Sequence, residues 1–312
     1  MSSHPAHLEP SELGTKEYWD KLYTTELRNH AADSSDIGTC WFDDSDAEAR
    51  ILRFLRSLTP DVFPTSASSD SDDDDDDDDD DNDNGGDEEE EEKSKTRTGT
   101  PLSRSGTSFL DLGCGNGALL FALRDAGWQG RMLGIDYSPQ SISLAHQIAR
   151  SRADNTPSTT DADTTADTTA DTIADADSCS GSPGIEFAEW DLIAGPMSVP
   201  GPQPWDVVLD KGTFDAISLS GPGAVGAAAY AARRPVESYR ERMLALVRPG
   251  GLFVVTSCNW TEDELRAWFE RGRQGQGEGE AFTVVGRVDY PTFTFGGVKG
   301  QTITTLCFQR GR

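Results

Sequence analysis

The sequence predicts an α/β domain with a mostly parallel sheet and an antiparallel strand at its end. Three observations support this prediction. Short apolar runs alternate with amphipathic helical patterns, a Gly-rich turn joins the first of these runs to a helix, and two further strands close the chain. Ligands in open sheets of this kind bind beyond the carboxyl ends of the strands. We therefore look for the functional residues at those ends.

The net charge of −28 over 312 residues is concentrated in two segments. Residues 70–92 hold 18 acidic residues and no basic one, and residues 155–184 add six aspartates, which leaves −4 for the rest of the chain. We expect disordered acidic insertions at 61–107 and 155–184, because neither stretch has enough apolar surface to offset the entropy of ordering. The first insertion is a solvated spacer or an electrostatic lure for a basic partner.

Composition also excludes several classes of function. No cluster of Lys and Arg is present, so we expect no direct contact with nucleic acid. No apolar run approaches the ~20 residues of a membrane helix, and no secretory signal is visible. The five cysteines are scattered and lack a C-x-x-C pair, which indicates reduced thiols in a cytoplasmic or nuclear protein with no metal site. We expect a monomer.

Two helices are predicted ahead of the sheet. Residues 1–14 lack an apolar period and are expected to be a flexible tail, so the folded domain is predicted to span 15–312. Thr15 can cap the first helix, whose aromatic-rich face packs on the domain or forms part of a lid over the site. Ser45 with Glu48 fits a capping box for the second helix. The face of the first helix comprises Tyr18, Trp19, Leu22, Tyr23 and Leu27.

Residues 108–120, SFLDLGCGNGALL, read as a strand, a tight turn and the start of a helix. Gly113, Gly115 and Gly117 allow positive φ and leave the backbone bare, so a ligand can lie against it. The spacing is neither that of a P-loop nor G-x-G-x-x-G, which disfavours those nucleotide sites. Asp111 precedes the first glycine by two residues. The turn therefore combines a bare backbone with a carboxylate.

Later strands end in carboxylates as well. The second strand, 131–136, ends at Asp136 before a helix marked by Ser138 and Pro139. A third strand is expected at 185–191 and a fourth at 205–210, which ends at Asp210 and runs into the turn KGTFDAISL. A helix at 236–247, a strand at 251–258, a helix capped by Thr261 and Glu264, and two closing strands at 281–290 and 302–310 complete the expected seven-stranded sheet.

The motif DLGCGNG, followed by an acidic residue at the end of the next strand, resembles the first motif of class I S-adenosylmethionine-dependent methyltransferases. YWDKLYTTEL, GTCWF, GIDYSP, DKGTFDAISL, SCNWTEDEL and FTFGG, in this order, are similar to segments of the eukaryotic protein-lysine methyltransferases that modify translation elongation factor 1-alpha. The resemblance implies a single Rossmann-like domain, S-adenosyl-L-methionine as cofactor and methylation of a lysine of that factor. The departures are the two acidic insertions and a Gly/Ala-rich stretch at 221–232.

The resemblance also implies which residues hold the cofactor. Asp136 would accept the two ribose hydroxyls, and Asp191 the adenine amino group. Asp111, with the backbone around Gly113, would face the methionyl ammonium. The full expected set is Asp111, Gly113, Gly115, Gly117, Asp136, Tyr137, Asp191 and Trp41.

The turn after the fourth strand is where related enzymes hold the methyl acceptor. A lysine amine, with a reference pKa of ~10.4, must lose a proton before it attacks the methyl carbon. Asp210 would orient or deprotonate this amine, Phe214 would line a channel for the lysine stem, and Lys211 is expected to pair with a carboxylate rather than act as a base. Thr213, Asp215, Asn259 and Trp260 complete the expected substrate end. Alternative hypotheses are methylation of another protein or a small molecule, and a non-catalytic acidic interaction protein on this fold.

Overall fold

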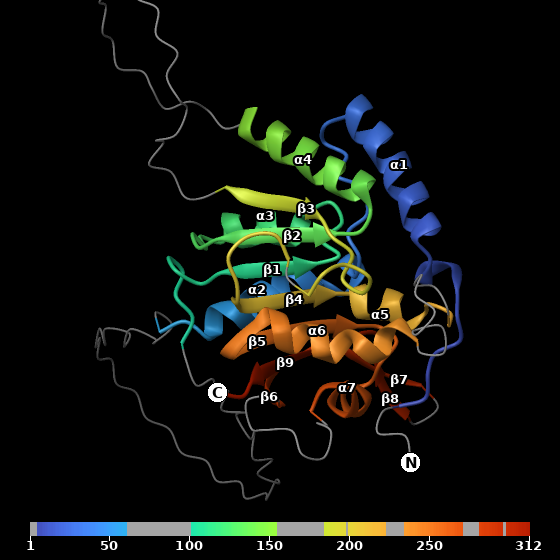
Figure 1. Ribbon diagram of the computed structural model, residues 1–312, viewed down its shortest axis with the longest axis vertical. Coiled ribbons are helices and arrows are strands. Elements are labelled where there is room, and N and C mark those ends of the chain that lie inside the picture. The colour runs from blue at the N-terminus through green and yellow to red at the C-terminus, as the bar shows by residue number, and fades with distance from the viewer. Residues whose placement is uncertain are drawn as a thin grey trace, which may run out of the picture.

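The computed structural model describes residues 5–60, 101–154, 184–197, 199–222, 234–270, 281–295 and 298–312 (Figure 1). Nearly all of the two predicted acidic insertions, and most of the Gly/Ala-rich stretch, lie outside the described residues. None of the described helices has both the length and the apolar character that crossing a membrane requires.

A seven-stranded sheet forms the centre of the molecule, in the order β3-β2-β1-β4-β5-β9-β6. Neighbours from β3 to β5 are parallel, and β9 pairs antiparallel with both β5 and β6. This is the predicted fold class. The strands are β1 Phe109–Leu112, β2 Met132–Asp136, β3 Ile185–Glu189, β4 Trp205–Lys211, β5 Val247–Ser257, β6 Phe282–Val288 and β9 Thr304–Arg310. A separate hairpin, β7 Thr292–Phe295 with β8 Val298–Gln301, lies between β6 and β9 in the chain.

Helices cover both faces of the sheet (Figure 1). One apolar core lies under α6 and α7 and includes Leu110, and the other lies under α2, α3 and α4 and includes Phe109, because neighbouring strand residues point to opposite faces. The helix α1 packs beside α4 near the carboxyl ends of the parallel strands. The helices are α1 Lys16–Ala32, α2 Ala47–Ser57, α3 Ala118–Asp125, α4 Pro139–Asp154, α5 Thr213–Ser218, α6 Tyr239–Leu246 and α7 Glu262–Phe269, with short 3-10 turns η1 Glu12–Gly14, η2 Asp43–Ser45 and η3 Pro235–Ser238.

The described part of the predicted tail, residues 5–14, is docked on the domain. The backbone N–H of Ser11 donates to the carbonyl of Leu219 at 3.1 Å, and the guanidinium of Arg234 donates to the carbonyl of Leu8 at 2.5 Å. The prediction of a flexible tail is therefore wrong for these residues. Hydrogen bonds to main-chain atoms hold this segment, and such bonds need no apolar period in the sequence.

Residues 101–107 were expected within the first insertion but belong to the fold. Leu102 is buried, and its N–H donates to the carbonyl of Leu58 at 3.1 Å. The N–H of Gln129 donates to the carbonyl of Arg104 at 2.7 Å. The predicted insertion therefore extends too far along the chain. A single buried leucine among polar residues gives too weak a pattern to indicate an ordered segment.

The two predicted capping boxes have different outcomes. Thr261 and Glu264 form theirs, with the Thr261 N–H donating to Oε2 of Glu264 at 2.9 Å. The box of Ser45 and Glu48 is absent: α2 begins at Ala47 after Asp46, whose φ is 54° and whose side chain makes no cap. Ser45 instead ends η2, because the chain turns sharply at Phe42 before α2 starts. Glu48 is thereby free to face a cavity.

Candidate active site

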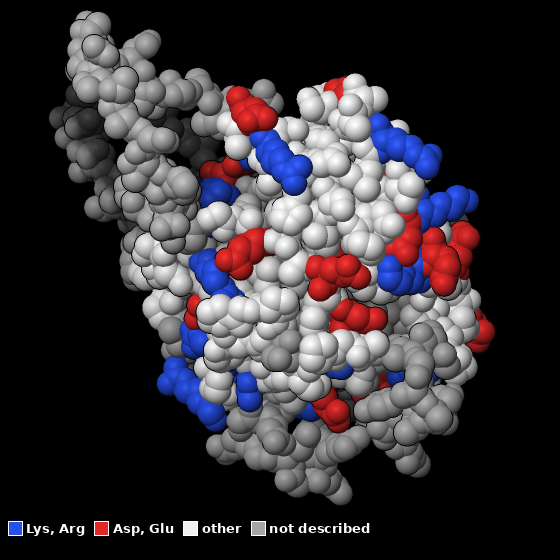
Figure 2. Space-filling view, turned by 45° about the horizontal axis from the view of Figure 1, so that its top comes forward, with Lys and Arg blue, Asp and Glu red and all other residues white. Residues whose placement is uncertain are grey.

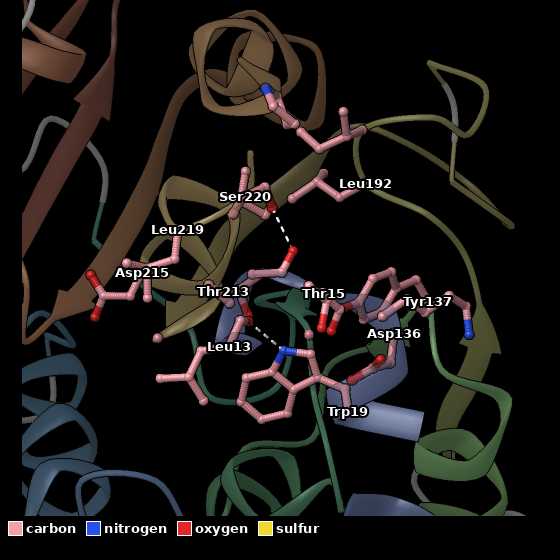
Figure 3. Close-up of a pocket in the computed structure, with 18 of the residues that line it drawn as sticks. Leu13, Thr15, Trp19, Asp136, Tyr137, Leu192, Thr213, Asp215, Leu219 and Ser220 are labelled. Atoms are coloured by element: carbon pink, nitrogen blue, oxygen red, sulfur yellow. Dashed lines mark hydrogen bonds between the residues drawn. The ribbon is translucent and has the colours of Figure 1, made fainter. Parts of the chain in front are cut away.

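A cavity of about 530 Å³ opens at the carboxyl ends of the parallel strands (Figure 3). Its walls come from the segment before α1, the first turns of α1, the loop before η2, the ends of β1, β2 and β4, the segment after β3, α5, and the loop after β5. Asp136 and Asp215 lie on opposite sides of this cavity (Figure 3). The predicted site residues that line it are Trp41, Gly113, Asp136, Tyr137, Asp191, Lys211, Thr213, Asp215 and Asn259.

A second, polar cavity of about 30 Å³ adjoins the first. Trp41, Gly113 and Lys211 line both cavities, so the two share a wall, and we term the small one the side chamber. Asp111 and Gly115 line only the side chamber. The structure therefore gathers eleven of the predicted site residues around two adjoining cavities.

The glycine turn brings bare backbone to the cavity. Gly113 and Gly115 have φ of 59° and 56°. A Cβ atom on Gly113 would lie 2.2 Å from Oγ1 of Thr213, and one on Gly115 would lie 2.7 Å from the Tyr23 hydroxyl. Both positions therefore require glycine on grounds of conformation and of space. Gly117 has φ of 80° at the start of α3 and packs against Phe187, and it lines neither cavity.

Asp136 is buried at the end of β2, and its carboxylate oxygens can accept hydrogen bonds from a ligand in the cavity. Its Oδ2 accepts the N–H of Gly115 at 3.2 Å, and its Oδ1 accepts the N–H of Ser138 at 2.9 Å. Burial raises the pKa of this carboxyl, and the hydrogen bond from Ser138 opposes the shift. Each carboxylate oxygen can accept a second hydrogen bond, so Asp136 fits a vicinal diol.

Aromatic and polar groups surround the space beyond Asp136. The Tyr137 hydroxyl donates to the carbonyl of Thr15 at 3.4 Å, and the ammonium of Lys16 lies 5.3 Å from the Tyr137 ring centroid. Oδ1 of Asp191 accepts the N–H groups of Ile193 and Ala194, both at 2.8 Å, so this carboxylate shapes the loop after β3 as well as facing the cavity.

Two indole groups on the cavity wall carry buried donors. Nε1 of Trp190 and Nε1 of Trp41 are buried, and no described residue accepts a hydrogen bond from either. The two aromatic residues line the cavity, and with the diol acceptor Asp136 and the bare glycine turn they fit an adenosine-bearing cofactor.

Asp111 is buried in the side chamber, and no described residue donates a hydrogen bond to its carboxylate. Burial raises the pKa of Asp111 to about 8, although the nearby Lys211 ammonium lowers it. The carboxylates Glu48, Asp210 and Asp136 raise it further, so negative groups outnumber the Lys211 ammonium here, and the positive charge of a ligand ammonium would favour the ionised form.

Lys211 stands at the end of β4 between the two cavities. Its Nζ donates to the carbonyl of Trp41 at 3.0 Å and lies 3.5 Å from Oε1 of Glu48. Glu48 is the carboxylate partner that was expected for Lys211 but not identified. Because the spacing to Ser45 made Glu48 look like a capping residue, the sequence contained no separate signal for this role.

Asp210 and Phe214 lie beneath the cavity and line neither chamber. Asp210 accepts the N–H groups of Thr213 and Phe214 at 3.0 Å, and the Tyr239 hydroxyl also donates to it. Burial raises the pKa of Asp210 to about 7. Phe214 is fully buried, with its ring centroid 5.0 Å from that of Phe269. These two side chains therefore support α5 and do not reach the wall of either cavity.

Phe214 points into the core because residues 213–218 of KGTFDAISL form a helix where a turn was expected. The helix α5 starts at Thr213, directly after Gly212, and its rotation directs residue 214 into the core and residue 215 toward the cavity. Trp260 is likewise buried, and its Nε1 donates to Oγ of Ser218 at 3.2 Å. The expected roles of Phe214 in a lysine channel and Trp260 in a substrate wall are corrected to core packing.

Asp215 holds the loop after β5 against the cavity. Oγ of Ser257 donates to Oδ1 of Asp215 at 2.5 Å, and the N–H of Cys258 donates to Oδ2 at 2.8 Å. Burial raises the pKa of Asp215, and the Ser257 hydrogen bond opposes this. Asn259 thereby reaches the wall. Among the described residues, no group of three or more His, Cys, Asp or Glu is arranged to hold a metal ion.

Comparisons with known proteins show which family the chain is similar to. Residues 103–156 match a family described as "Methyltransferase domain". The chain is 33% identical to protein-lysine N-methyltransferase EFM4 of Saccharomyces cerevisiae, over 97% of this chain and 96% of the relative. It is 26% identical to EEF1A lysine methyltransferase 2 of Homo sapiens, over 96% and 88%. The N-methyltransferase NodS from Bradyrhizobium japonicum WM9, solved with S-adenosyl-l-homocysteine, aligns at 14% identity and a TM-score of 0.44 over 93% of this chain and all of that chain.

Proposed function

The chain belongs to the family of protein-lysine N-methyltransferases that includes EFM4 and EEF1A lysine methyltransferase 2, and we propose that it methylates a lysine side chain of translation elongation factor 1-alpha. S-adenosyl-L-methionine is the methyl donor. One observation carries the proposal: a single cavity connects a diol acceptor at the end of β2, through the bare glycine turn of β1, to the ends of β4 and β5. The space therefore suits a donor and an acceptor side by side.

The residues on the β2 and β3 side would bind the donor. When bound, S-adenosylmethionine supplies an electrophilic methyl group on a sulfonium sulfur. Asp136 accepts the ribose hydroxyls, and Tyr137 with Trp190 encloses the base while Asp191 offers its second oxygen to the amino group. Asp111 in the side chamber accepts the ammonium. The donor is thereby held at both ends.

The residues on the β4 and β5 side would align the lysine. Asp215 is the carboxylate of this wall, and the hydrogen bonds that it accepts from Ser257 and Cys258 fix the wall in place. Holding two reactants in line can supply ~7 to 11 kcal/mol of the barrier. We infer that positioning, rather than a protein nucleophile, is the main catalytic contribution of this chain.

Transfer of labelled methyl groups to the factor tests the proposal. Purified elongation factor 1-alpha and a panel with each lysine replaced by arginine are incubated with the enzyme and labelled S-adenosylmethionine. We expect labelling that is lost in one variant only, and none with the Asp136→Ala enzyme. Absence of label in the wild-type factor would rule out the assigned substrate.

We also propose that the enzyme acts as a cytoplasmic or nuclear monomer without direct contact to nucleic acid or membrane. The four described cysteines Cys40, Cys114, Cys258 and Cys307 are free thiols, which supports a reducing compartment. Figure 2 shows acidic and basic side chains interspersed on one face, without a continuous basic patch. Light scattering of the purified chain, cell fractionation and binding assays with nucleic acid and vesicles test these statements.

A further inference from the structure

Phe42 has an unusual backbone conformation for a bulky residue. Its φ of 65° and ψ of 25° place it in the left-handed region, which strongly favours glycine. Its carbonyl accepts the N–H groups of Ser45 and Ala47 at 3.2 and 3.3 Å, and Asp46 is also left-handed. Residues 41–46, which we term the aromatic turn, are therefore held in a strained shape. Such strain persists where surrounding contacts impose it, and it clusters at ligand sites.

Lys211 fastens the aromatic turn to the end of β4. Its Nζ donates to the carbonyl of Trp41, and Glu48 at the start of α2 lies beside the same ammonium. The Lys211 side chain is 13% exposed, so this contact is well shielded from water. The Lys211 ammonium thus joins the end of β4, on the proposed acceptor side of the cavity, to the aromatic turn that precedes α2.

The ring of Phe42 lies on the acceptor side of the cavity. A Cβ atom on Gly212 would be 3.4 Å from this ring, which places the ring over the turn between β4 and α5. Phe42 also packs against the small apolar cluster of Ala47, Tyr290 and Ile303, and it lines the cavity. In the sheet order, β4, β5 and β9 lie on one side of β1, and β2 with Asp136 lies on the other. The ring is therefore separated from the diol acceptor by the glycine turn.

We propose that Phe42 is a specificity-determining residue for the acceptor, with its ring forming the wall along which the methylene stem of the target lysine lies. The inference rests on the proposed function and deepens it. An aromatic face matches a chain of methylene groups and attracts an ammonium or methylammonium group at its end. Lys211 acts as a positioning residue, because its bond to the Trp41 carbonyl sets where the ring stands.

The test separates acceptor binding from donor binding. Phe42→Ala and Phe42→Gly are compared with the wild type for the KM of elongation factor 1-alpha, and for the Kd of S-adenosyl-L-homocysteine by calorimetry. We expect the KM to rise at least tenfold in both variants while the Kd stays within twofold. Phe42→Gly relaxes the strained backbone, so a high KM in that variant cannot come from misfolding caused by strain. Phe54→Ala, a partly buried residue of α2 outside the cavity, is the matched control and should leave the KM unchanged.

If Lys211 positions the Phe42 ring, substitutions at the two residues should not have additive effects on the KM. Lys211→Met should raise the KM for the factor, and adding Phe42→Ala to it should cause little further loss, because the ring is already displaced. An unchanged KM in folded Phe42 variants would overturn the inference, and so would weaker binding of the donor product without a change in KM. In either case, labelling of the factor by the wild type would still support the proposed function. Absence of labelling by the wild type would reject both.

Discussion

Asp136 accepts two backbone N–H groups and still has lone pairs directed at the cavity. Asp136→Asn should weaken binding of S-adenosyl-L-homocysteine about 10- to 100-fold, because hydrogen bonds to a charged group contribute ~1.5–3 kcal/mol each. Isothermal calorimetry measures this loss. Asp125→Asn, which removes an exposed carboxylate paired with Arg152, is the matched control. Equal affinity of the Asp136 variant and the wild type would refute the ribose assignment.

The raised pKa of Asp111 predicts that donor binding depends on pH. Its pKa of about 8 without ligand means that the carboxyl is partly protonated at neutral pH. Ammonium binding requires the ionised form, so donor affinity should rise between pH 6.5 and about 8 in the wild type and stay level in Asp111→Asn. Calorimetry over this pH range checks the difference. Parallel curves for the two proteins would show that Asp111 does not face the ammonium.

The same carboxyl affects stability. Its folded pKa of about 8 lies above the ordinary aspartate value of 3.8, so the folded state binds more protons, and stability is lost as pH rises between these two values. Asp111→Asn removes that loss. The free energy of unfolding of the variant, relative to the wild type, should therefore increase from pH 5 to pH 8 in urea titrations. A constant difference between the two proteins would contradict the buried position.

At the scale of elements, the segment before α1 closes the cavity by contact with the end of α5. Oγ of Ser220 donates to the carbonyl of Gly14 at 2.8 Å, and Nε1 of Trp19 donates to the carbonyl of Leu13 at 2.8 Å (Figure 3). A Cβ on Gly14 would lie 2.3 Å from main-chain atoms of Leu219. Gly14→Ala should therefore displace this segment.

We expect faster hydrogen exchange in residues 8–15 and several-fold weaker donor binding in Gly14→Ala. Gly106→Ala is the control, because a Cβ there would lie 3.7 Å from its nearest neighbour, the Ser103 side chain. Wild-type exchange and affinity in the Gly14 variant would mean that the segment does not close the site.

The start of α5 depends on a buried pair between β4 and α6. The Tyr239 hydroxyl donates to Asp210, which in turn accepts the first N–H groups of α5. Tyr239→Phe should lower the free energy of unfolding by about 1–3 kcal/mol, since a buried carboxylate loses a donor. Urea unfolding measures this, with Tyr18→Phe on α1 as control. A Tyr239 variant as stable as the wild type would argue against this support of α5.

At the scale of the molecule, the sheet and the strand-end carboxylates could be predicted because each rests on a local pattern. The short apolar strands, the glycines of the turn and Asp136 at the end of β2 all carry their signal within a few residues. The orientation of Phe214 could not be predicted, because a six-residue helix looks like a turn until its support from Tyr239 is known. Local patterns define elements, and contacts across the chain decide which side chains reach the cavity.

Glu48 and the docked segment 5–14 show the same limit. Glu48 meets Lys211, which is 163 positions away in the chain, and Leu8 meets Arg234 through a carbonyl. Neither contact depends on residue types that stand out in a sequence. The position of Glu48 in the side chamber and the docking of residues 5–14 could therefore not be predicted from the sequence.

The acidic segment 70–92 lies outside the described residues, and both cavities are lined by residues elsewhere in the chain. Deleting it should leave the Kd for the donor product and the unfolding temperature unchanged. If the segment is a solvated spacer, the KM for the factor at low salt also stays unchanged. A rise in that KM at low salt, where screening is weakest, would favour an electrostatic lure.

We propose that this chain moves a methyl group from S-adenosylmethionine to a lysine of elongation factor 1-alpha. Peptide mass spectrometry of the factor after incubation with the enzyme and the donor detects this transfer. We predict one lysine-containing peptide that gains the mass of one or more methyl groups with the wild-type enzyme and gains none with Asp136→Asn. An unmodified factor in the wild-type reaction, with donor binding shown by calorimetry, would contradict the claim.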